Sequence, residues 1–417
     1  MLINRPLFWL LDSDINYTND TICILNDEYR INILLVTKCA STTIRDFIQH
    51  REKLLSQLNE EESMYTQICF TRPVEERFYS AFRTIFHKQK LIKKADFIKK
   101  QSREGLLNFI IENGDAHFTP ISTLLRGARI DHIYDLKVLE NIKFRKNVAH
   151  DYHEDNIKRI KDMNLFSDPR IQKYYSKDYE YYDKSSMYVT PVVSRLFGNT
   201  LPVQKYLFIL TPAFNGSSTI ASLIDSSPNT SFGDNVKYEG LLSINPRSMM
   251  TKSSNWYNLN YKPDYSDIMK INWKNKPIKC DKYPPYMIRA NEMEKYFEQF
   301  GDVYFICSTR HPYSSRHQIE WNTEIEIMHD NLKSLKRVHF MRYEDLLYNY
   351  DREVKRLLEF LPGLNSLDKD KVTTSHSSCG RTNGIIDCQD YTKSRGNFNK
   401  EYMKELGYLE EESYVLI

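Results

Sequence analysis

The stretch that decides the fold reads Leu34-Leu35-Val36-Thr37-Lys38-Cys39-Ala40-Ser41-Thr42-Thr43-Ile44-Arg45. The apolar run 31–36 predicts a buried strand, and the small and hydroxyl residues after it predict a short loop. Apolar spacing beyond the loop predicts an amphipathic helix from Thr43 to about Leu58. Such a loop brings backbone N–H groups, hydroxyls and the Lys38 ammonium to a helix N-terminus. Because unpaired N–H groups and the helix dipole attract negative charge there, the stretch predicts a binding site for a phosphate-like anion.

The same stretch also fits an ordinary strand–loop–helix turn in which Ser41 or Thr42 caps the helix. A nucleoside-triphosphate P-loop is excluded, because the chain contains no G-x-x-x-x-G-K-[ST] motif. The choice between an anion site and a simple capped turn therefore depends on the next segment.

In that segment, Thr66 to Phe70 predicts another short buried strand, with Arg72 at its end and Ser80 two helical turns later. A guanidinium offers a planar fork suited to a phosphate, and a serine hydroxyl can donate to the same group. An amphipathic helix start with surface arginines is the alternative interpretation. Both segments together favour an anion site built from two neighbouring strand ends.

The two segments resemble the 5′-phosphosulfate loop and the 3′-phosphate motif of carbohydrate sulfotransferases of the chondroitin 4-O type. These enzymes use 3′-phosphoadenosine 5′-phosphosulfate (PAPS) as donor, and their motifs read P-K-x-A-[SC]-T-S-x-x-R and R-D-P-[FY]-x-R-x-x-S-A-[YF]. The chain matches the motifs at Lys38, Ala40, Ser41, Thr42, Arg45, Arg72, Arg77, Ser80, Ala81 and Phe82. It departs from them at Thr37, which replaces proline, and at Pro73-Val74, which replaces Asp-Pro.

Three further segments are similar to pieces of the same family, in the family's order. Segment 117–125 resembles H-W-x-P-Q-x-x-L-C, segment 131–140 resembles Y-D-F-I-G-K-x-E-x-L, and segment 174–182 resembles Y-x-x-D-[FY]-x-x-[FY]. The five pieces span residues 30–183. The resemblance implies a carbohydrate-sulfotransferase-like domain over residues 1–184.

Residues 185–205 contain Pro191, Gly198 and Pro202 and predict a linker. After it, Tyr206 to Leu210 predicts a strand and Ile220 to about Ser226 a helix. The loop between them, 211–219, resembles the P-[PR]-[RF]-x-G-[ST]-[ST]-x-L loop of another sulfotransferase branch. The plan of strand, anion loop and helix is thus repeated.

Downstream, 282–290 resembles that branch's K-S-P-P-x-x-x-R-A segment. The predicted strand Val303 to Ser308 leads into Arg310-His311-Pro312-Tyr313, which is similar to R-[DHN]-P-[YR]. Residues 342–346 resemble R-Y-E-D-L before a helix at about 351–360. We therefore expect 206–417 to be a second, divergent sulfotransferase-like domain, and the fold class to be α/β with two P-loop-like domains, each a central parallel sheet flanked by helices.

The resemblance implies roles for individual residues of the first domain. Lys38 would be the catalytic cation at the leaving-group oxygen and a donor ligand. The 5′-phosphosulfate would be held by Ala40, Ser41, Thr42 and Thr43, and the 3′-phosphate by Arg72 and Ser80. His117 is the first candidate for the general base, with His87 and Glu76 as alternatives.

In the second domain the donor ligands would be Asn215, Gly216, Ser217, Ser218, Thr219, Lys282 and Arg310. Phe214 stands where many sulfotransferases carry a basic residue, and Gln318 stands where a 3′-phosphate serine is expected. Lys282 is a candidate to restore the missing cation. Glu239, His311 and Glu320 are unranked candidates for a base.

The composition bounds the class of protein. The chain has 417 residues, 41% hydrophobic content and a net charge of +3, which suits two or three domains and gives no electrostatic case for nucleic-acid binding. Seven scattered cysteines favour reduced thiols, although Cys379 and Cys388 could pair. No signal peptide, membrane-spanning run or metal-ligand cluster is evident in the sequence, so we expect a cytoplasmic protein without membrane or metal partners.

The leading hypothesis is a PAPS-dependent sulfotransferase that acts on a hydroxyl, for which we expect a carbohydrate, and releases 3′-phosphoadenosine 5′-phosphate (PAP). The first alternative is a catalytically degenerate nucleotide- or glycan-binding protein, above all in the second half. A nucleoside-phosphate kinase is a third possibility, which the missing Walker lysine loop opposes.

Overall fold

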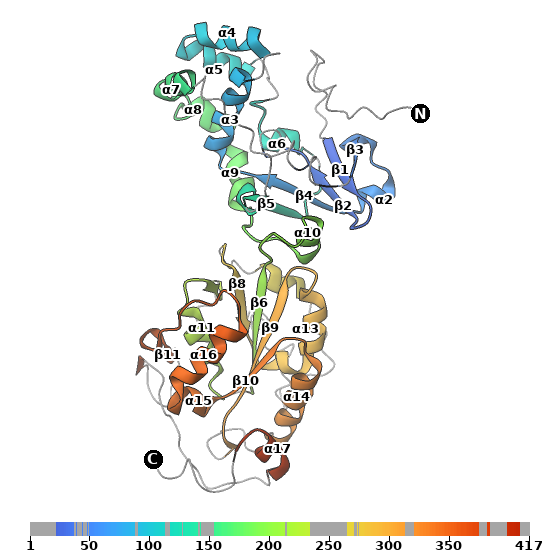
Figure 1. The fold of residues 1–417 in the computed structure, drawn as a ribbon, viewed down its shortest axis with the longest axis vertical. Helices are drawn as coiled ribbons and strands as arrows, with labels where there is room; N and C mark the ends of the chain where they lie inside the picture. The colour runs from blue at the N-terminus through green and yellow to red at the C-terminus, as the bar shows by residue number, and fades with distance from the viewer. Residues whose placement is uncertain are drawn as a thin grey trace. The chain divides into compact units, whose positions relative to one another are not determined.

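The computed structural model describes residues 22–36, 39, 44, 48, 50–87, 91–112, 117–126, 128–140, 142, 154–212, 215–233, 265–270, 273, 275–312, 321–374, 382–383 and 398–408. The chain divides into two compact units, Met1–Pro202 and Val203–Ile417 (Figure 1). Each unit is considered by itself below.

The first unit contains a five-stranded sheet of order β3-β1-β2-β4-β5. Its strands are β1 (Ile22–Asn26), β2 (Ile31–Leu34), β3 (Arg51–Leu54), β4 (Thr66–Thr71) and β5 (His132–Asp135). Strands β2, β4 and β5 are parallel, whereas β1 runs antiparallel to β2 and β3. The sheet is therefore only partly parallel, because the short turn 27–30 joins β1 directly to β2 and forces them to run antiparallel.

Helices cover both faces of this sheet and extend beyond it (Figure 1). They are α2 (Glu60–Ser63), α3 (Val74–His87), α4 (Ile92–Lys100), α5 (Arg103–Glu112), α6 (Ile121–Leu124), α7 (Glu154–Asp162), α8 (Pro169–Tyr174), α9 (Ser176–Asp183) and α10 (Pro191–Leu196), with 3-10 turns at Leu55–Gln57 and Leu136–Leu139. Residues of α10 pack on one sheet face and residues of α6 on the other. A separate apolar core joins α3, α4, α5, α7 and α8 around Phe78 and Phe82.

The predicted helix from Thr43 to about Leu58 is wrong in its second half, where the chain forms β3 instead. Arg51 donates to both carboxylate oxygens of Asp27, at 2.8 and 2.7 Å. The Lys53 ammonium lies 2.7 Å from both carboxylate oxygens of Glu62. Residues 51–54 have good helix propensity, but pairing with β1 and these charge contacts outweigh it.

The expected linker 185–205 is also folded in most of its length. It contains α10, and Val189, Val193, Phe197 and Leu201 are buried in the core of the first unit. The boundary between the two units falls after Pro202, inside the segment. The proline and glycine residues of this segment lie at or near the ends of a short packed helix and do not mark an extended connection.

Acid is expected to weaken the contact between α2 and β3, because it protonates Glu62, whose carboxylate contacts Lys53. A hydrogen bond from Lys53, followed by the backbone N–H of Asn59, lowers the Glu62 pKa from 4.5 to about 2. Because the folded-state pKa is depressed, this stabilisation is present above about pH 4.5 and is lost as the pH falls towards 2. Urea midpoints measured across this range should fall more steeply for the wild type than for Glu62→Gln. Glu60→Gln, an exposed change on the same helix, is the control; equal slopes in all three proteins would contradict the assignment.

The second unit is built on five strands that are all parallel, in the order β10-β9-β6-β8-β7. They are β6 (Lys205–Leu210), β7 (Thr230–Ser231), β8 (Ile278–Lys282), β9 (Asp302–Thr309) and β10 (Val338–Arg342). Strands β6 and β9 are apolar on both faces, as expected of parallel strands covered on both sides.

Two layers of helices cover this sheet (Figure 1). Helices α11 (Ser217–Asp225), α15 (Tyr343–Tyr348) and α16 (Tyr350–Phe360) contribute to the core on one face, and α13 (Ala290–Phe297) and α14 (Trp321–Ser334) to the core on the other. The remaining elements are α17 (Lys400–Glu405), the short strands β11 (Thr373–Thr374) and β12 (Thr382–Asn383), and 3-10 turns at Tyr265–Lys270, Pro284–Arg289 and Lys369–Lys371. The predicted α/β class, a parallel sheet between helices, is confirmed.

The strand order of the second unit creates a topological switch point at β6. The chain leaves β6 for the edge strand β7, returns to β8 beside β6, and then crosses to β9 on the other side. In open α/β sheets, ligands bind at the carboxyl ends of the strands around such a point. The ends of β8, β6 and β9 are therefore the place to look for a site.

The described residues include no helix that is both long and apolar enough to cross a membrane. Within the same residues there is no group of three or more His, Cys, Asp or Glu side chains placed to hold a metal ion.

Candidate functional site

The candidate site of the second unit lies at the carboxyl edge of its three middle strands. Loop 211–216 follows β6, Lys282 ends β8, and Arg310 follows β9. The parallel register pairs Ile209 with Lys282 and Leu210 with Cys307, so all three chain segments reach the same edge. Residues far apart in the sequence are thereby brought together.

Gly216 sets the start of α11. It is the N-cap residue in the left-handed conformation, with φ of 85°, and it has no side chain to cap the helix. A Cβ at this position would lie 2.2 Å from Cδ2 of Tyr343. Glycine is therefore required both by its backbone conformation and by the aromatic ring against it. The first turn, Ser217 to Thr219, offers N–H groups and hydroxyls of the kind that bind anions at helix N-termini.

Lys282 brings a positive charge to this helix end. Its side chain is almost fully buried, and its ammonium Nζ lies 3.3 Å from Oγ of Ser218. The neighbouring Asp281 carboxylate is engaged elsewhere, because it accepts from the Tyr286 hydroxyl and from the backbone N–H of Lys282. The Lys282 ammonium is thus placed at the N-terminus of α11 by a strand, not by the loop.

Arg310 supplies the second cation. Its side chain is only 9% exposed, and its Nε and Nη2 atoms have no hydrogen-bond partner among the residues that the structure describes. The guanidinium lies 5.3 Å from the centroid of the Tyr343 ring. Its backbone N–H donates to Oδ1 of the buried Asn215 at 3.0 Å, which ties the loop after β6 to the end of β9. A buried guanidinium with unused donors is costly unless an anion binds it.

Sequence reasoning missed two residues of this site, Tyr343 and Glu344. The segment containing them resembles R-Y-E-D-L, but nothing in that pattern indicates that Tyr343 lies between Gly216 and Arg310. Glu344 is buried, which raises its pKa, and its Oε1 accepts from the backbone N–H of His311 at 2.8 Å. Their position follows from β10 lying next to β9.

The other second-unit candidates fare differently. Burial lowers the pKa of His311 to about 4, and its ring packs against Tyr408 with centroids 5.3 Å apart. This interior position gives no support to His311 as the base. Phe214, Glu239, Gln318 and Glu320 lie outside the described residues.

In the first unit, Lys38, Ala40, Ser41, Thr42 and Thr43 also lie outside the described residues. Cys39, the described residue among them, is buried. The Cys39 thiol lies against the backbone N–H of Arg72, and burial raises its pKa to about 11. Cys39, which follows β2, therefore lies next to Arg72, which follows β4.

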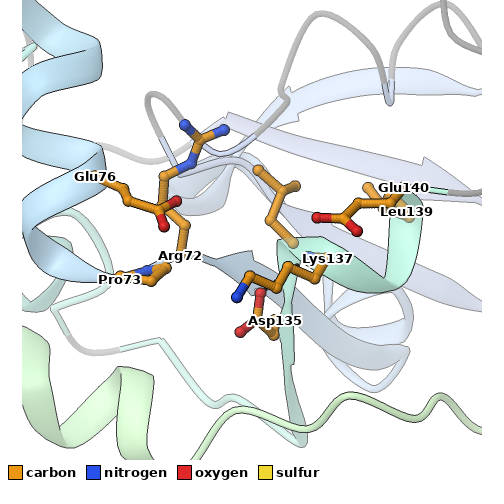
Figure 2. A pocket seen from close by; sticks show the side chains of 8 residues that line it. Arg72, Pro73, Glu76, Asp135, Lys137, Leu139 and Glu140 are labelled. Carbon is orange, nitrogen blue, oxygen red and sulfur yellow. Dashed lines mark hydrogen bonds between the residues drawn. The ribbon is translucent and has the colours of Figure 1, made fainter.

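Arg72 borders a pocket of about 400 Å³ at the carboxyl ends of β4 and β5. The pocket is lined by Arg72, Pro73, Glu76, Asp135, Leu136, Lys137, Leu139 and Glu140. Figure 2 shows Arg72, which follows β4, and Glu76, in the first turn of α3, across from Asp135, the last residue of β5, and Lys137, in the 3-10 turn after it. The Arg72 Nε has no hydrogen-bond partner among the described residues. Ser80 and His117 are not among the lining residues, and the side chain of His87 lies outside the described part.

Arg77 serves the fold rather than the pocket. It forms a buried ion pair with Asp178, with Nη1 and Oδ2 3.3 Å apart, and also donates to the carbonyl oxygen of Thr119. The Asp178 carboxylate accepts from the backbone N–H groups of Ile121 and Ser122 at 2.8 and 3.0 Å. Parts of segments 72–82, 117–125 and 174–182 therefore meet at one buried contact. The residues of 117–125 that take part follow His117 in the chain.

Similarity between this chain and known proteins is found among solved structures. No family model matches it, and no curated protein sequence matches it. Among solved structures, the sulfotransferase domain from the Synechococcus PCC 7002 olefin synthase is similar at 15% identity, covering 49% of this chain and 93% of that domain with a TM-score of 0.32. The sulfotransferase domain from the curacin biosynthetic pathway is similar at 15% identity, covering 50% and 99%, with a TM-score of 0.31.

Proposed function

We propose that this chain is a PAPS-dependent sulfotransferase that moves a sulfuryl group to a hydroxyl acceptor. The observation that carries the proposal is the convergence of Lys282, Arg310 and the N-terminus of α11 at the edge of one parallel sheet. Two separated cations and a helix N-terminus suit a ligand with two anionic groups, such as a nucleotide that carries a 5′-phosphosulfate and a 3′-phosphate.

In this scheme the second unit binds the donor by its two ends. The backbone N–H groups and hydroxyls of Ser217, Ser218 and Thr219 hold the 5′-phosphosulfate. Lys282 neutralises the negative charge that develops on the bridging oxygen as the S–O bond to the leaving phosphate breaks. Arg310 pairs with the 3′-phosphate through its unused Nε and Nη2 donors. Positioning and electrostatics supply most of the catalysis, as in phosphoryl transfer.

The two units would obtain their catalytic cation from different places, and the strand directions explain the difference. In the second unit, β8 runs parallel to β6, so its last residue, Lys282, reaches the carboxyl edge. In the first unit, the corresponding neighbour of β2 is β1, which is antiparallel and brings its amino end to that edge. We propose that the cation there comes from the loop itself, as Lys38, with Ser41, Thr42 and Thr43 around the phosphosulfate.

A carbohydrate acceptor is proposed for the first unit on the strength of its resemblance to the chondroitin 4-O type. The pocket beside Arg72 supports a hydroxyl-bearing acceptor, because Glu76 and Glu140 line it and carboxylates accept hydrogen bonds from hydroxyls. Of the proposed bases, Glu76 lines this pocket and His117 does not. Glu76 is therefore the candidate base that borders a described cavity.

Calorimetric titration with PAP tests the proposal on the wild type, Arg72→Ala and Arg310→Ala. We expect two sites, each weakened about ten- to a hundredfold by its own substitution, because a hydrogen bond to a charged group contributes about 1.5–3 kcal/mol. Arg83→Ala and Arg337→Ala remove the same charge from exposed or half-exposed positions in each unit and are the controls.

The outcomes separate the hypotheses. A single site lost only with Arg72 would make the second unit a binding or structural partner. Two sites without release of PAP from PAPS in the presence of sugars would favour the degenerate nucleotide-binding alternative. Absence of PAP binding in the wild type would end the sulfotransferase proposal.

A further inference from the structure

The main chain around Arg310 is held by side chains from three different elements. Its N–H donates to Asn215 of the loop after β6, as described above. Its carbonyl oxygen accepts from the indole Nε1 of Trp321, the first residue of α14, at 3.3 Å. The next N–H, that of His311, donates to Glu344 of α15 at 2.8 Å. The peptide units on both sides of Arg310 are thus fixed, while Nε and Nη2 of its guanidinium have no hydrogen-bond partner in the described part of the chain.

Two of these three contacts rest on a segment near the end of the chain, residues 398–408, which we call the C-terminal clip. The Tyr408 hydroxyl donates to Oε2 of Glu344 at 3.3 Å, on the carboxylate whose other oxygen holds His311. The Phe398 ring packs edge-on against Trp321, with centroids 5.6 Å apart. Met403 and Leu406 complete the same buried cluster.

The clip is itself attached at the carboxyl edge of the sheet. Arg342, the last residue of β10, donates from Nη1 to the carbonyl oxygen of Gly407 at 2.6 Å. The Arg342 guanidinium also lies 5.8 Å from the centroid of the Tyr408 ring. These contacts place the Tyr408 side chain in the interior, where it is 1% exposed.

From this arrangement we infer that the C-terminal clip is a positioning element for Arg310, with Tyr408 and Trp321 as its positioning residues. The inference rests on the proposed function, in which Arg310 binds the 3′-phosphate of the donor. A guanidinium recognises a phosphate only when its fork is held to within a fraction of an ångström, and the surrounding hydrogen bonds supply that constraint. The clip therefore sets affinity for a 3′-phosphorylated nucleotide without touching it.

A purely structural role for the clip would lower stability and leave the affinity of the folded protein unchanged. A positioning role predicts a selective effect, limited to ligands that carry the 3′-phosphate. PAP and adenosine 5′-phosphate differ only in that group, so their comparison separates the two roles.

The experiment uses the full chain with Arg72→Ala, so that the Arg310 site is the tighter of the two and its affinity is measured separately. Tyr408→Phe removes the hydroxyl that holds Glu344 and keeps the ring, and Trp321→Phe removes the indole donor to Arg310. Each should weaken PAP binding about threefold to tenfold, the effect of losing one hydrogen bond of typical net strength, with adenosine 5′-phosphate affinity unchanged. Tyr350→Phe, which loses a hydroxyl contact to the Leu367 carbonyl in the same unit, should change neither.

Unchanged PAP affinity in Tyr408→Phe and Trp321→Phe, with Arg310→Ala still weakening binding about ten- to a hundredfold, would overturn the inference and leave the proposed function standing. Equal losses for PAP and adenosine 5′-phosphate would also overturn it, because the effect would then not pass through Arg310. If the parent protein binds PAP only through residues other than Arg310, or not at all, both the inference and this half of the proposed function fail.

Discussion

In a chain whose first unit is silenced by Lys38→Ala, replacing Lys282 with methionine is expected to lower kcat for sulfuryl transfer about 100- to 1,000-fold, with a change in PAPS affinity of the second unit of less than about tenfold. The ammonium lies at the N-terminus of α11, beside Ser218, where the leaving-group oxygen of the donor would be. Charge on that oxygen grows during the reaction, so the interaction is stronger in the transition state than in the ground state. Methionine keeps an unbranched stem of similar length in the buried position.

PAP release under single-turnover conditions, with sugar hydroxyls or water as acceptor, measures this effect, and calorimetry with PAP measures the affinity. The matched control is Lys279→Met, on the same strand. Lys279 lies on the other face of the sheet, with its ammonium 5.5 Å from the centroid of the Trp273 ring. A Lys282→Met protein with normal turnover would remove Lys282 from the chemistry of the second unit.

Replacing Arg77 with methionine is expected to lower the free energy of unfolding by about 3–5 kcal/mol, the cost of breaking a buried ion pair by removing one partner. The Arg77 side chain is 1% exposed and that of Asp178 is not exposed at all. Among the described residues, the substitution would leave the interior Asp178 carboxylate with neutral hydrogen-bond donors, which are the Ile121 N–H and the backbone and hydroxyl of Ser122.

Urea denaturation of the full chain measures this loss. Lys99→Met removes a lysine whose partner Asp96 is exposed, and it should change stability by less than about 1 kcal/mol. Adding Asp178→Asn to Arg77→Met should recover part of the loss, because the amide carries no charge to bury. A stability loss for Arg77→Met no larger than that of the exposed control would show that the pair does not hold α3, α6 and α9 together.

The Arg77 contact shows both the reach and the limit of the sequence pattern. The ordered segments 72–82, 117–125 and 174–182 stand out in the sequence, and the structure brings parts of all three to one buried point. Arg77 matches the same motif as Arg72 and Ser80, although the resemblance gives the 3′-phosphate role to Arg72 and Ser80 alone. The structure distinguishes the two arginines. The Arg77 guanidinium is paired with Asp178 in the interior, whereas Arg72 borders a pocket.

Strand predictions were the most accurate part of the sequence interpretation. The apolar runs that predict strands at 31–36, 66–70, 206–210 and 303–308 all contain strands in the structure. The helix predicted at about 351–360 is present as α16. A run of apolar residues reports burial directly, and burial on both faces is what parallel strands require.

The errors arose where distant partners override local preference. Residues 51–54 have helical composition and form β3, because the free edge of β1 and the charges of Asp27 and Glu62 lie beside them. Segment 185–205 has the composition of a linker, yet its apolar residues fill the core under the first sheet. The strand and side chains that pair with residues 51–54, and the sheet that packs on segment 185–205, lie elsewhere in the sequence, so neither segment alone predicts them.

By itself, the sequence determined the α/β fold class, the positions of the main apolar strands, and the residue types able to meet an anion. Only the tertiary structure decided that Lys282 and Ser218 are neighbours, and that Tyr343, Glu344 and Tyr408 surround the end of β9. The physical reason is that apolar periodicity and loop chemistry are local properties of the chain. Which strand ends share an edge depends on strand order and direction, and these are set by packing between segments that lie far apart in the sequence.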